Sequence, residues 1–272
     1  GSKLISHLGT PAQKNSLLPA LLAGDLLTTL AWTEPAGGSD VLAMSTSATR
    51  TSSGWELSGT KTFITLADKA DLILTVARSR PEAERRSEGI SCFAVPAGSE
   101  GLTIRPIEKM GQRGTTFCEV HFERVAVPDD AVLGTEGASW KELVPLLSSE
   151  RTCFAAICVG LAKAAFEDAL AYVHERTAFG KTIAHFQSLQ HHLVDMHRLI
   201  LGAELVVHRA AWLEAAGRPF SMDATEALLV ASEMASTVTD LGVQLLGGYG
   251  LTEEFDLERY WRDARVFRVS PV

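Results

Sequence analysis

The spacing of apolar residues changes near residue 137 of this chain, and the change restricts the folds that the chain can adopt. Between residues 30 and 133, apolar side chains come in short runs, at 72–76, 90–95 and 117–122, separated by Pro, Gly, Ser and Asp. Such runs, bounded by turn residues, predict antiparallel strands. From Ser139 onward, apolar residues recur at intervals of three and four, the period of an amphipathic helix. We therefore predict an α+β chain in which a β-domain precedes a helical bundle.

Composition places the chain among globular proteins and argues against several partners. Its 272 residues are 46% hydrophobic and 21% charged, enough to bury one or two cores. No window approaches the roughly 18 apolar residues of a membrane span, and the first ten residues do not resemble a signal peptide. The net charge of −8 gives no reason to expect a nucleic-acid partner. We expect a cytoplasmic protein without membrane attachment.

Three local features refine this picture. Leucines before residue 30 are spaced as in short helices broken near Gly9 and Pro11. Pro145, inside the first helical pattern of the bundle, is predicted to break or kink that helix, with Ser148 or Ser149 capping the continuation. Histidines gather within one predicted helix, but adjacent and five-apart positions do not share a helical face, so no metal site is expected. Those histidines are His191, His192 and His197.

Residues 244–265 read QLLGGYGLTEEFDLERYWRDAR, which is a helix end, a glycine-rich turn and an aromatic-basic helix start. This string resembles a segment of the acyl-CoA dehydrogenase family. Three further segments are similar to the same family in the same order, at 30–40 (LAWTEPAGGSD), at 59–65 (GTKTFIT) and at 176–187. The resemblance implies an acyl-CoA dehydrogenase-like fold.

In that family a helical N-terminal domain is followed by an antiparallel β-barrel and a C-terminal four-helix bundle. On this pattern, residues 1–29 are the remnant of the N-terminal helical domain. Residues 30–136 are the middle β-barrel domain, and residues 137–272 are the C-terminal helical bundle domain.

The resemblance also implies that the cofactor is FAD, held partly by the β-domain. The pyrimidine edge of a flavin needs hydrogen-bond partners in a dry pocket, and short hydroxyls and exposed backbone N–H groups suit it. Phe63 stands where most relatives have a tryptophan that packs on the flavin ring, and the hydroxyl of Thr65 is expected to face flavin N5. The expected contacts in this part are Trp32, Thr33, Gly38, Ser39, Phe63 and Thr65.

A second group of residues resembles the part of the family that holds the FAD of a neighbouring subunit. Arg176 is expected to pair with the pyrophosphate, because a diphosphate in a partly buried cleft needs a permanent, fork-shaped cation. Phe179 is expected near the adenosine. The remaining members of this group are Gln187, Gln244, Gly247 and Gly248. This arrangement implies a homodimer or homotetramer.

The catalytic carboxylate is not at the position that is usual in the family. Desaturating an acyl thioester requires a carboxylate to remove the α-proton. Most family members carry this glutamate in the motif RDAxxxxxxEGT, but here Pro271 occupies the glutamate's position, and no Asp or Glu lies between Arg265 and the end of the sequence. A minority branch, which includes the isovaleryl and long-chain enzymes, carries its base on the first helix of the bundle. This chain has Glu150 there.

Glu150 is therefore the candidate catalytic base, and Arg151 resembles the arginine that the family keeps beside the acyl-CoA site. Ser39 is a second candidate substrate contact. The competing interpretation is that Glu150 is an ordinary first-turn glutamate, favoured by the helix dipole.

The sequence leads to one principal function and two alternatives. The principal function is an FAD-dependent acyl-CoA dehydrogenase acting on acyl-CoA or an acyl carrier protein thioester, and passing electrons to an electron-transfer flavoprotein-type acceptor. The first alternative is a flavin-dependent oxygenase or N-hydroxylase with the same fold. The second is a non-catalytic subunit that lends Arg176 and Gln244 to the FAD of a partner chain in a hetero-oligomer.

Overall fold

The structure, a computed structural model, describes residues 1–269. Contacts divide the chain into two compact units. The first consists of Gly1–Lys109 and Arg113–Leu146, and the second of Met110–Gln112 and the described residues from Leu147 onward. The short segment Met110–Gln112 thus belongs to the helical unit, although it connects two strands of the sheet.

The first unit begins with two short helices, α1 (Ser2–Leu8) and α2 (Pro11–Ala23). The first helix ends and the second begins where the sequence predicts a break, because Thr10 caps the start of α2. Its hydroxyl accepts a hydrogen bond from the Gln13 backbone N–H at 3.2 Å, and the Gln13 side chain accepts one from the Thr10 N–H at 2.8 Å. This reciprocal pair satisfies two N–H groups that an uncapped helix leaves without partners.

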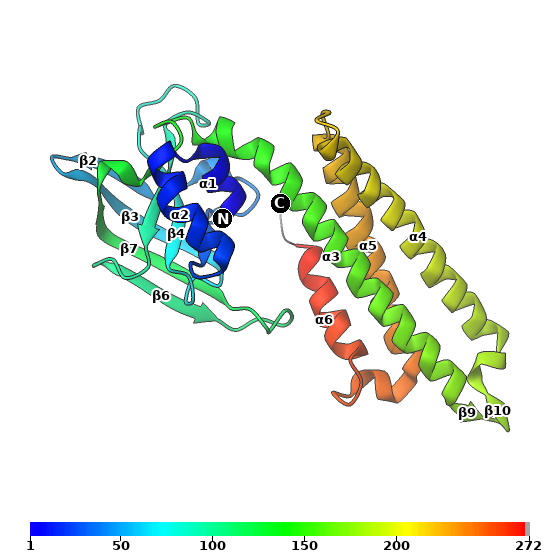
Figure 1. The fold of residues 1–272 in the computed structure, drawn as a ribbon. Coiled ribbons are helices and arrows are strands. Elements are labelled where there is room, and N and C mark those ends of the chain that lie inside the picture. The colour runs from blue at the N-terminus through cyan, green and yellow to red at the C-terminus, as the bar shows by residue number, and fades with distance from the viewer. Residues whose placement is uncertain (270–272) are drawn as a thin grey trace. The chain divides into compact units, whose positions relative to one another are not determined.

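The rest of the first unit is an eight-stranded sheet with the strand order β6-β7-β3-β2-β4-β5-β8, and β1 pairs with β4 (Figure 1). Most pairings are antiparallel, as predicted. The exceptions are β1 with β4 and a single β2–β4 contact, which are parallel. The path of paired strands in the described residues runs from β6 at one end to β8 at the other. The strands are β1 (Thr28–Ala31), β2 (Ser47–Thr51), β3 (Gly54–Thr65), β4 (Leu72–Arg78), β5 (Ile90–Pro96), β6 (Leu102–Ile107), β7 (Phe117–Val127) and β8 (Val132–Leu133), with 3-10 turns η1 (Val41–Ala43) and η2 (Asp129–Ala131).

Strand β3 contains an irregularity that later determines which side chains are exposed. Its register against β7 shifts between Lys61 and Ile64, and Phe63 has a φ of +58°, in the left-handed region. A bulge of this kind interrupts the alternation of inward and outward side chains. Consequently Lys61, Thr62 and Ile64 are buried, whereas Phe63 and Thr65 are exposed.

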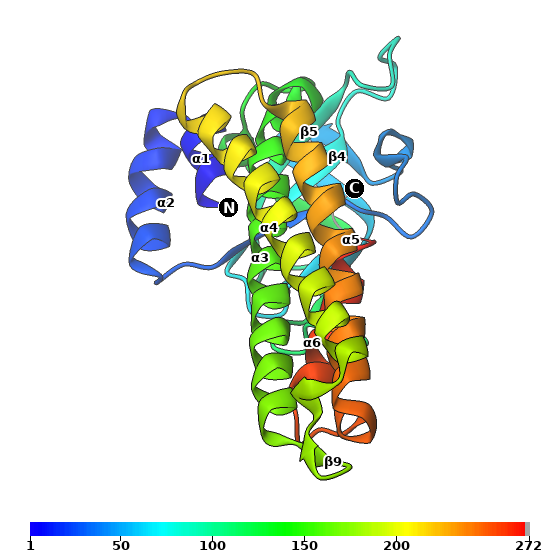
Figure 2. The same cartoon turned by 90° about the vertical axis from the view of Figure 1, so that its right-hand side faces the viewer.

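The second unit is a helical bundle whose chain direction alternates from one helix to the next (Figures 1 and 2). Its core is rich in alanine, which lets helix backbones approach closely. The predicted antiparallel β-domain and helical bundle are both confirmed. The helices are α3 (Ser139–Glu175), α4 (Gln187–Ala215), α5 (Ser221–Leu246) and α6 (Leu257–Phe267), with the hairpin strands β9 (Thr177–Ala178) and β10 (Lys181–Thr182) and the 3-10 turns η3 (Ile183–His185) and η4 (Gly247–Leu251).

The predicted break at Pro145 does not occur, because α3 continues through it. A proline in a helix removes one backbone hydrogen bond and costs about 3 kcal/mol, which burial of neighbouring side chains can outweigh. Leu143 is 1% exposed and Ser148 is 3% exposed. Nor does Ser149 cap a new helix, since its hydroxyl donates to the Glu214 carboxylate. Across residues 1–269, moreover, none of the helices has the length and apolar character needed to cross a membrane.

Candidate functional site

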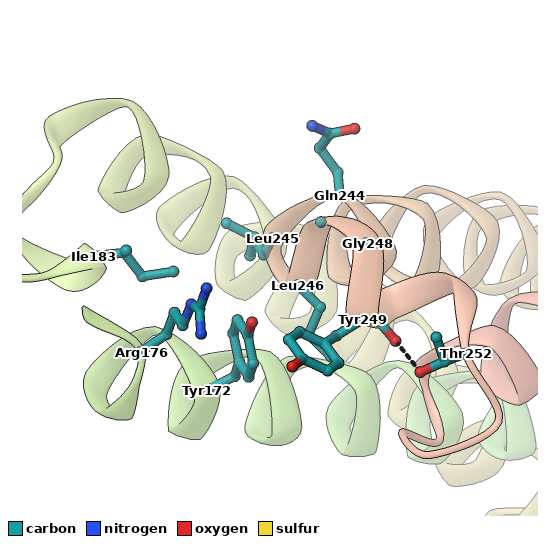
Figure 3. A pocket seen from close by; sticks show the side chains of 10 residues that line it. Tyr172, Arg176, Ile183, Gln244, Leu245, Leu246, Gly248, Tyr249 and Thr252 are labelled. Atoms are coloured by element: carbon teal, nitrogen blue, oxygen red, sulfur yellow. Dashed lines mark hydrogen bonds between the residues drawn. The ribbon is translucent and has the colours of Figure 1, made fainter. Parts of the chain in front are cut away.

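A pocket of about 510 Å³ lies in the helical unit, where the end of α3 meets the end of α5 (Figure 3). Its lining combines Arg176 with Gln244, Gly247 and Gly248, which the sequence predicts as one group although about seventy positions separate them. The other lining residues are Tyr172, Ile183, Leu245, Leu246, Tyr249 and Thr252.

The side chains that line this pocket point in two directions. The Arg176 guanidinium lies 6.0 Å from the centre of the Tyr249 ring. The Tyr249 ring contacts Tyr172, which in turn contacts Phe255, so the three rings form one aromatic cluster. Gln244 projects away from Arg176 in Figure 3. The structure therefore brings the arginine and the glycines together in one pocket, while the Gln244 amide points away from the arginine.

Two glycines leave the backbone open beside the arginine. Gly247 has a φ of +61° and a ψ of −132°, a conformation that side chains rarely permit. A Cβ added at Gly247 or Gly248 would meet nothing within 4 Å, so packing does not require glycine at either position. A permanent cation, accessible backbone and aromatic rings fit the diphosphate and ring system of a dinucleotide cofactor.

The hairpin after α3 presents an aromatic ring to solvent. Phe179 is 94% exposed, has a φ of +52°, and contacts only Phe186 among the aromatic rings of the described chain, at 6.0 Å. A non-glycine residue in this conformation costs about 1–3 kcal/mol unless its surroundings compensate. Neither Phe179 nor Gln187, which is exposed at the start of α4, lines the pocket of its own chain.

In the sheet unit, Trp32 and Thr33 lie directly after β1. Trp32 is 9% exposed and packs edge-on against Trp140 at 6.0 Å. Within residues 1–269, its indole N–H is buried without a hydrogen-bond partner. A buried donor of this kind costs about 1–3 kcal/mol. The orphaned N–H, the half-buried Thr33 and the accessible backbone at Gly38 therefore fit a ligand with several hydrogen-bond acceptors.

Phe63 and Thr65 both project outward from the end of β3. The Phe63 ring is 57% exposed and leans edge-on against Phe117 at 6.4 Å. The backbone of Thr65 is fixed from inside the unit, since its carbonyl accepts a hydrogen bond from the Thr29 hydroxyl at 2.6 Å. Ser39 is exposed in the loop that follows Thr33. The exposed aromatic face and nearby hydroxyls match the predicted support for a flat ring.

Glu34 and Lys61 form a buried ion pair that the sequence analysis did not identify. Lys61 is 0% exposed and Glu34 4%, and their charged atoms lie 2.8 Å apart. Burial opposes ionisation of Glu34, but the Lys61 charge and hydrogen bonds from Ser45 and Thr46 outweigh it and lower the pKa of Glu34 to about 2. The one sequence signal for this pair was a lysine inside the predicted strand GTKTFIT. The alternation of inward and outward side chains along a strand does not by itself predict that an ammonium group is buried.

Glu150 lies on α3, twelve residues into the helix. The acidic residue of the first turn is Glu142, so the interpretation of Glu150 as a first-turn glutamate is wrong. The residue as a whole is exposed, yet the surrounding protein desolvates its carboxyl enough to raise its pKa, against the opposing charge of Arg151. A raised pKa suits a general base that works near neutral pH. Pro271, at the family's usual glutamate position, lies outside the described residues.

The loop Met110–Gln112 is attached to α6 by several contacts. The Arg262 guanidinium donates to the Met110 carbonyl at 2.9 Å, and the Gln112 N–H donates to the Asp263 carboxylate. Between these contacts, a Cβ on Gly111 would lie 2.3 Å from the Arg262 carbonyl oxygen. The Arg-Asp pair of the RDA string therefore anchors a loop, a role that the sequence analysis did not assign.

Comparisons with known proteins agree with this architecture. Residues 29–125 match the model "Acyl-CoA dehydrogenase, middle domain", and residues 140–270 match "Acyl-CoA dehydrogenase, C-terminal domain". Sheet and bundle together form the core of an FAD-dependent oxidoreductase fold. The chain belongs to the acyl-CoA dehydrogenase family.

Individual relatives make the comparison concrete. The chain is 38% identical to acryloyl-CoA reductase (NADH) of Anaerotignum propionicum over 97% of this chain and 68% of that protein. Its structure matches butyryl-CoA dehydrogenase from Megasphaera elsdenii with a TM-score of 0.95 at 36% identity, covering 99% of this chain and 70% of that one. The FAD complex of PigA gives a TM-score of 0.94 at 28% identity, covering 99% and 70%.

Several curated relatives are acyl-CoA dehydrogenases named for short, branched or long acyl chains, and the family uses FAD. This chain spans 61% of the length of the short/branched chain specific acyl-CoA dehydrogenase of Rattus norvegicus and 71% of that of the probable acyl-CoA dehydrogenase YngJ of Bacillus subtilis.

Proposed function

We propose that this chain forms the β-domain and the helical domain of an FAD-dependent acyl-CoA dehydrogenase that desaturates an acyl thioester between its α- and β-carbons. The observation that carries the proposal is the match of both units to the acyl-CoA dehydrogenase family, in which Glu150, a carboxylate on α3 directly before Arg151, is the candidate base. The sheet and bundle correspond to residues 30–136 and 137–272, preceded by a remnant of an N-terminal domain at 1–29.

The chain's own residues have distinct parts in this proposal. Glu150 removes the α-proton, and Arg151 and Ser39 contact the thioester substrate. Bound FAD supplies a two-electron acceptor for the hydride from the β-carbon. Thr33, Gly38 and the other predicted β-domain residues hold the flavin end of the cofactor through hydroxyls, backbone and the Phe63 ring.

Arg176 and the glycines at the end of α5 hold the pyrophosphate end of an FAD molecule that a neighbouring copy binds through its sheet unit. Supporting this is Phe179, whose ring is 94% exposed on a strained backbone and does not line the pocket of its own chain. Such a ring is best explained by a contact outside the chain. The proposal thus includes a homodimer or homotetramer, acyl-CoA or an acyl carrier protein thioester as substrate, and an electron-transfer flavoprotein-type acceptor.

An anaerobic titration tests the reaction. The purified holoenzyme is expected to be yellow and to lose its flavin absorbance when an acyl-CoA of suitable chain length is added, because desaturation reduces the flavin. Saturated thioesters of several lengths are titrated in parallel. Flavin that stays oxidised with all of them, in a preparation that consumes O₂ and a reductant when an amine or other substrate is supplied, would support the oxygenase alternative, for which Pro271 provides the sequence argument.

Arg176 provides a test of the pyrophosphate site. Arg176→Ala is expected to weaken FAD binding by about 10- to 100-fold, since a hydrogen bond to a charged group is worth about 1.5–3 kcal/mol. The dissociation constant is measured by fluorescence titration of the apoprotein. Arg198→Ala, which removes an exposed arginine paired with Asp195 on α4, is the matched control. Equal affinities in the two variants would exclude Arg176 from the site.

A further inference from the structure

The Glu34–Lys61 ion pair connects the two segments of the sheet unit that carry the proposed flavin contacts. Lys61 lies on β3, two residues before Phe63, and Glu34 follows Thr33. The Lys61 ammonium donates to the Glu34 carboxylate at 2.8 Å and to the Trp32 carbonyl at 3.0 Å. It therefore holds the residues on both sides of Thr33.

The backbone repeats this connection at Thr33 itself. The Thr62 N–H donates to the Thr33 carbonyl at 2.9 Å. With the two Lys61 contacts, three consecutive residues of the 32–34 segment are bonded to β3. The side chain of Thr33 stays half-buried between its buried neighbours Trp32 and Glu34.

Glu34 extends the connection to the far end of the following loop. Its carboxylate accepts hydrogen bonds from the Ser45 N–H and hydroxyl, both at 2.7 Å, and from the Thr46 N–H at 2.9 Å. The loop that contains Gly38 and Ser39 is thus closed at its base by one carboxylate. The same pair therefore holds β3, the 32–34 segment and the base of the loop.

Stability alone does not account for a fully buried ion pair. Taking two charges out of water offsets most of their mutual attraction, and well-packed apolar residues of similar volume often give equal or greater stability. What an ion pair provides and an apolar pair does not is directional bonding, which fixes one geometry among several packed ones.

We propose that Lys61 and Glu34 are positioning residues for the flavin. The pair holds Thr33 against β3, where the bulge turns Phe63 and Thr65 outward, and so keeps the hydroxyl and the aromatic contact of the proposed site in one fixed arrangement. This inference rests on the proposed function, since it presumes that these side chains meet FAD.

Three variants of the holoenzyme test the pair. Lys61→Met leaves the buried Glu34 carboxylate without its cation, and Glu34→Gln leaves the buried Lys61 ammonium without its counter-charge. Lys61→Met/Glu34→Gln removes both charges, while the new side-chain carbonyl at position 34 can still accept the hydrogen bonds from Ser45 and Thr46. The matched control is Arg50→Met, which removes one partner of the exposed Arg50–Asp129 pair in the same unit. Thermal unfolding, FAD affinity, the visible circular dichroism of the flavin and its reduction midpoint potential are measured for each.

The double variant separates positioning from stability. It is expected to unfold near the wild-type temperature, yet to bind FAD about tenfold more weakly, as expected for one misplaced hydrogen bond. Its flavin circular dichroism and midpoint potential are expected to differ from those of the wild type and the control. If single variants fail to fold, the double variant still decides the question.

Three outcomes separate the positioning role of the pair from the proposed function. A double variant with wild-type FAD affinity, circular dichroism and potential would show that the pair is only structural. A well-folded wild-type protein that binds no added FAD would instead overturn the proposed function, and the positioning role with it. Wild-type bleaching by acyl-CoA together with an unchanged double variant would overturn the positioning role alone.

Discussion

Glu150→Gln is expected to leave FAD bound and to lower turnover by about 10²- to 10⁴-fold, the range that a positioned general base contributes. The carboxamide has nearly the size of the carboxylate but cannot take up the substrate's α-proton. The measurements are steady-state kcat/KM and the rate of flavin bleaching after anaerobic mixing with acyl-CoA. Because the chemical step alone is affected, FAD content and the thermal unfolding temperature should stay at wild-type values.

The pH dependence provides a second test of Glu150. A base must be deprotonated to act, so kcat/KM is expected to fall as pH decreases through the pKa of Glu150, which desolvation raises above the ordinary value of 4.5. This acidic decline should be absent from the residual activity of Glu150→Gln. Glu167→Gln, an exposed carboxylate on the same helix, is the control and should behave as wild type. Wild-type turnover in Glu150→Gln would remove this residue from the mechanism.

Gly111→Ala is expected to destabilise the helical unit by about 2–3 kcal/mol or more, because an added methyl group has no space. The new Cβ would lie 2.3 Å from the Arg262 carbonyl oxygen, 2.6 Å from its carbonyl carbon and 2.9 Å from the Asp263 nitrogen, all of them backbone atoms. A flexible side chain could move aside, whereas a helix backbone cannot do so without losing the contacts that hold the loop. Urea unfolding measures the loss, and hydrogen exchange of α6 locates it.

Gly114→Ala is a closely matched control for this substitution. It lies three residues further along the chain, where an added Cβ meets nothing within 4 Å. We expect a change within about 0.5 kcal/mol, as for surface substitutions in general. Equal stabilities of the two alanine variants would show that the contact between Gly111 and α6 is not close in solution.

Local pattern was a reliable guide wherever one element's own residues decide its structure. Runs of five or six residues rich in apolar side chains predicted β4, β5 and β7, and the break between α1 and α2 followed from Gly9 and Pro11. The grouping of Arg176 with Gly247 and Gly248 came from the family resemblance, and the structure places them in one pocket. Whether these residues bind FAD stays a prediction.

Two predictions from local sequence, at Pro145 and Glu150, differ from the structure. Pro145 predicted a break or a kink, yet α3 continues through it, because burial along a helix can exceed the cost of one missing hydrogen bond. The interpretation of Glu150 as a first-turn residue depended on that break. Once α3 begins at Ser139, the same glutamate lies well inside the helix and the dipole argument no longer applies.

The amino-acid sequence by itself determined the order of sheet and bundle, because the spacing of apolar residues is a property of neighbouring positions. The residues proposed to hold the cofactor and the candidate base came from the resemblance of short segments to one family. Only the tertiary structure decided that Lys61 is buried against Glu34 and that Gly111 lies against the backbone of Arg262. Those contacts join residues 27 and 151 positions apart, and a close approach between distant segments is determined by how whole elements pack.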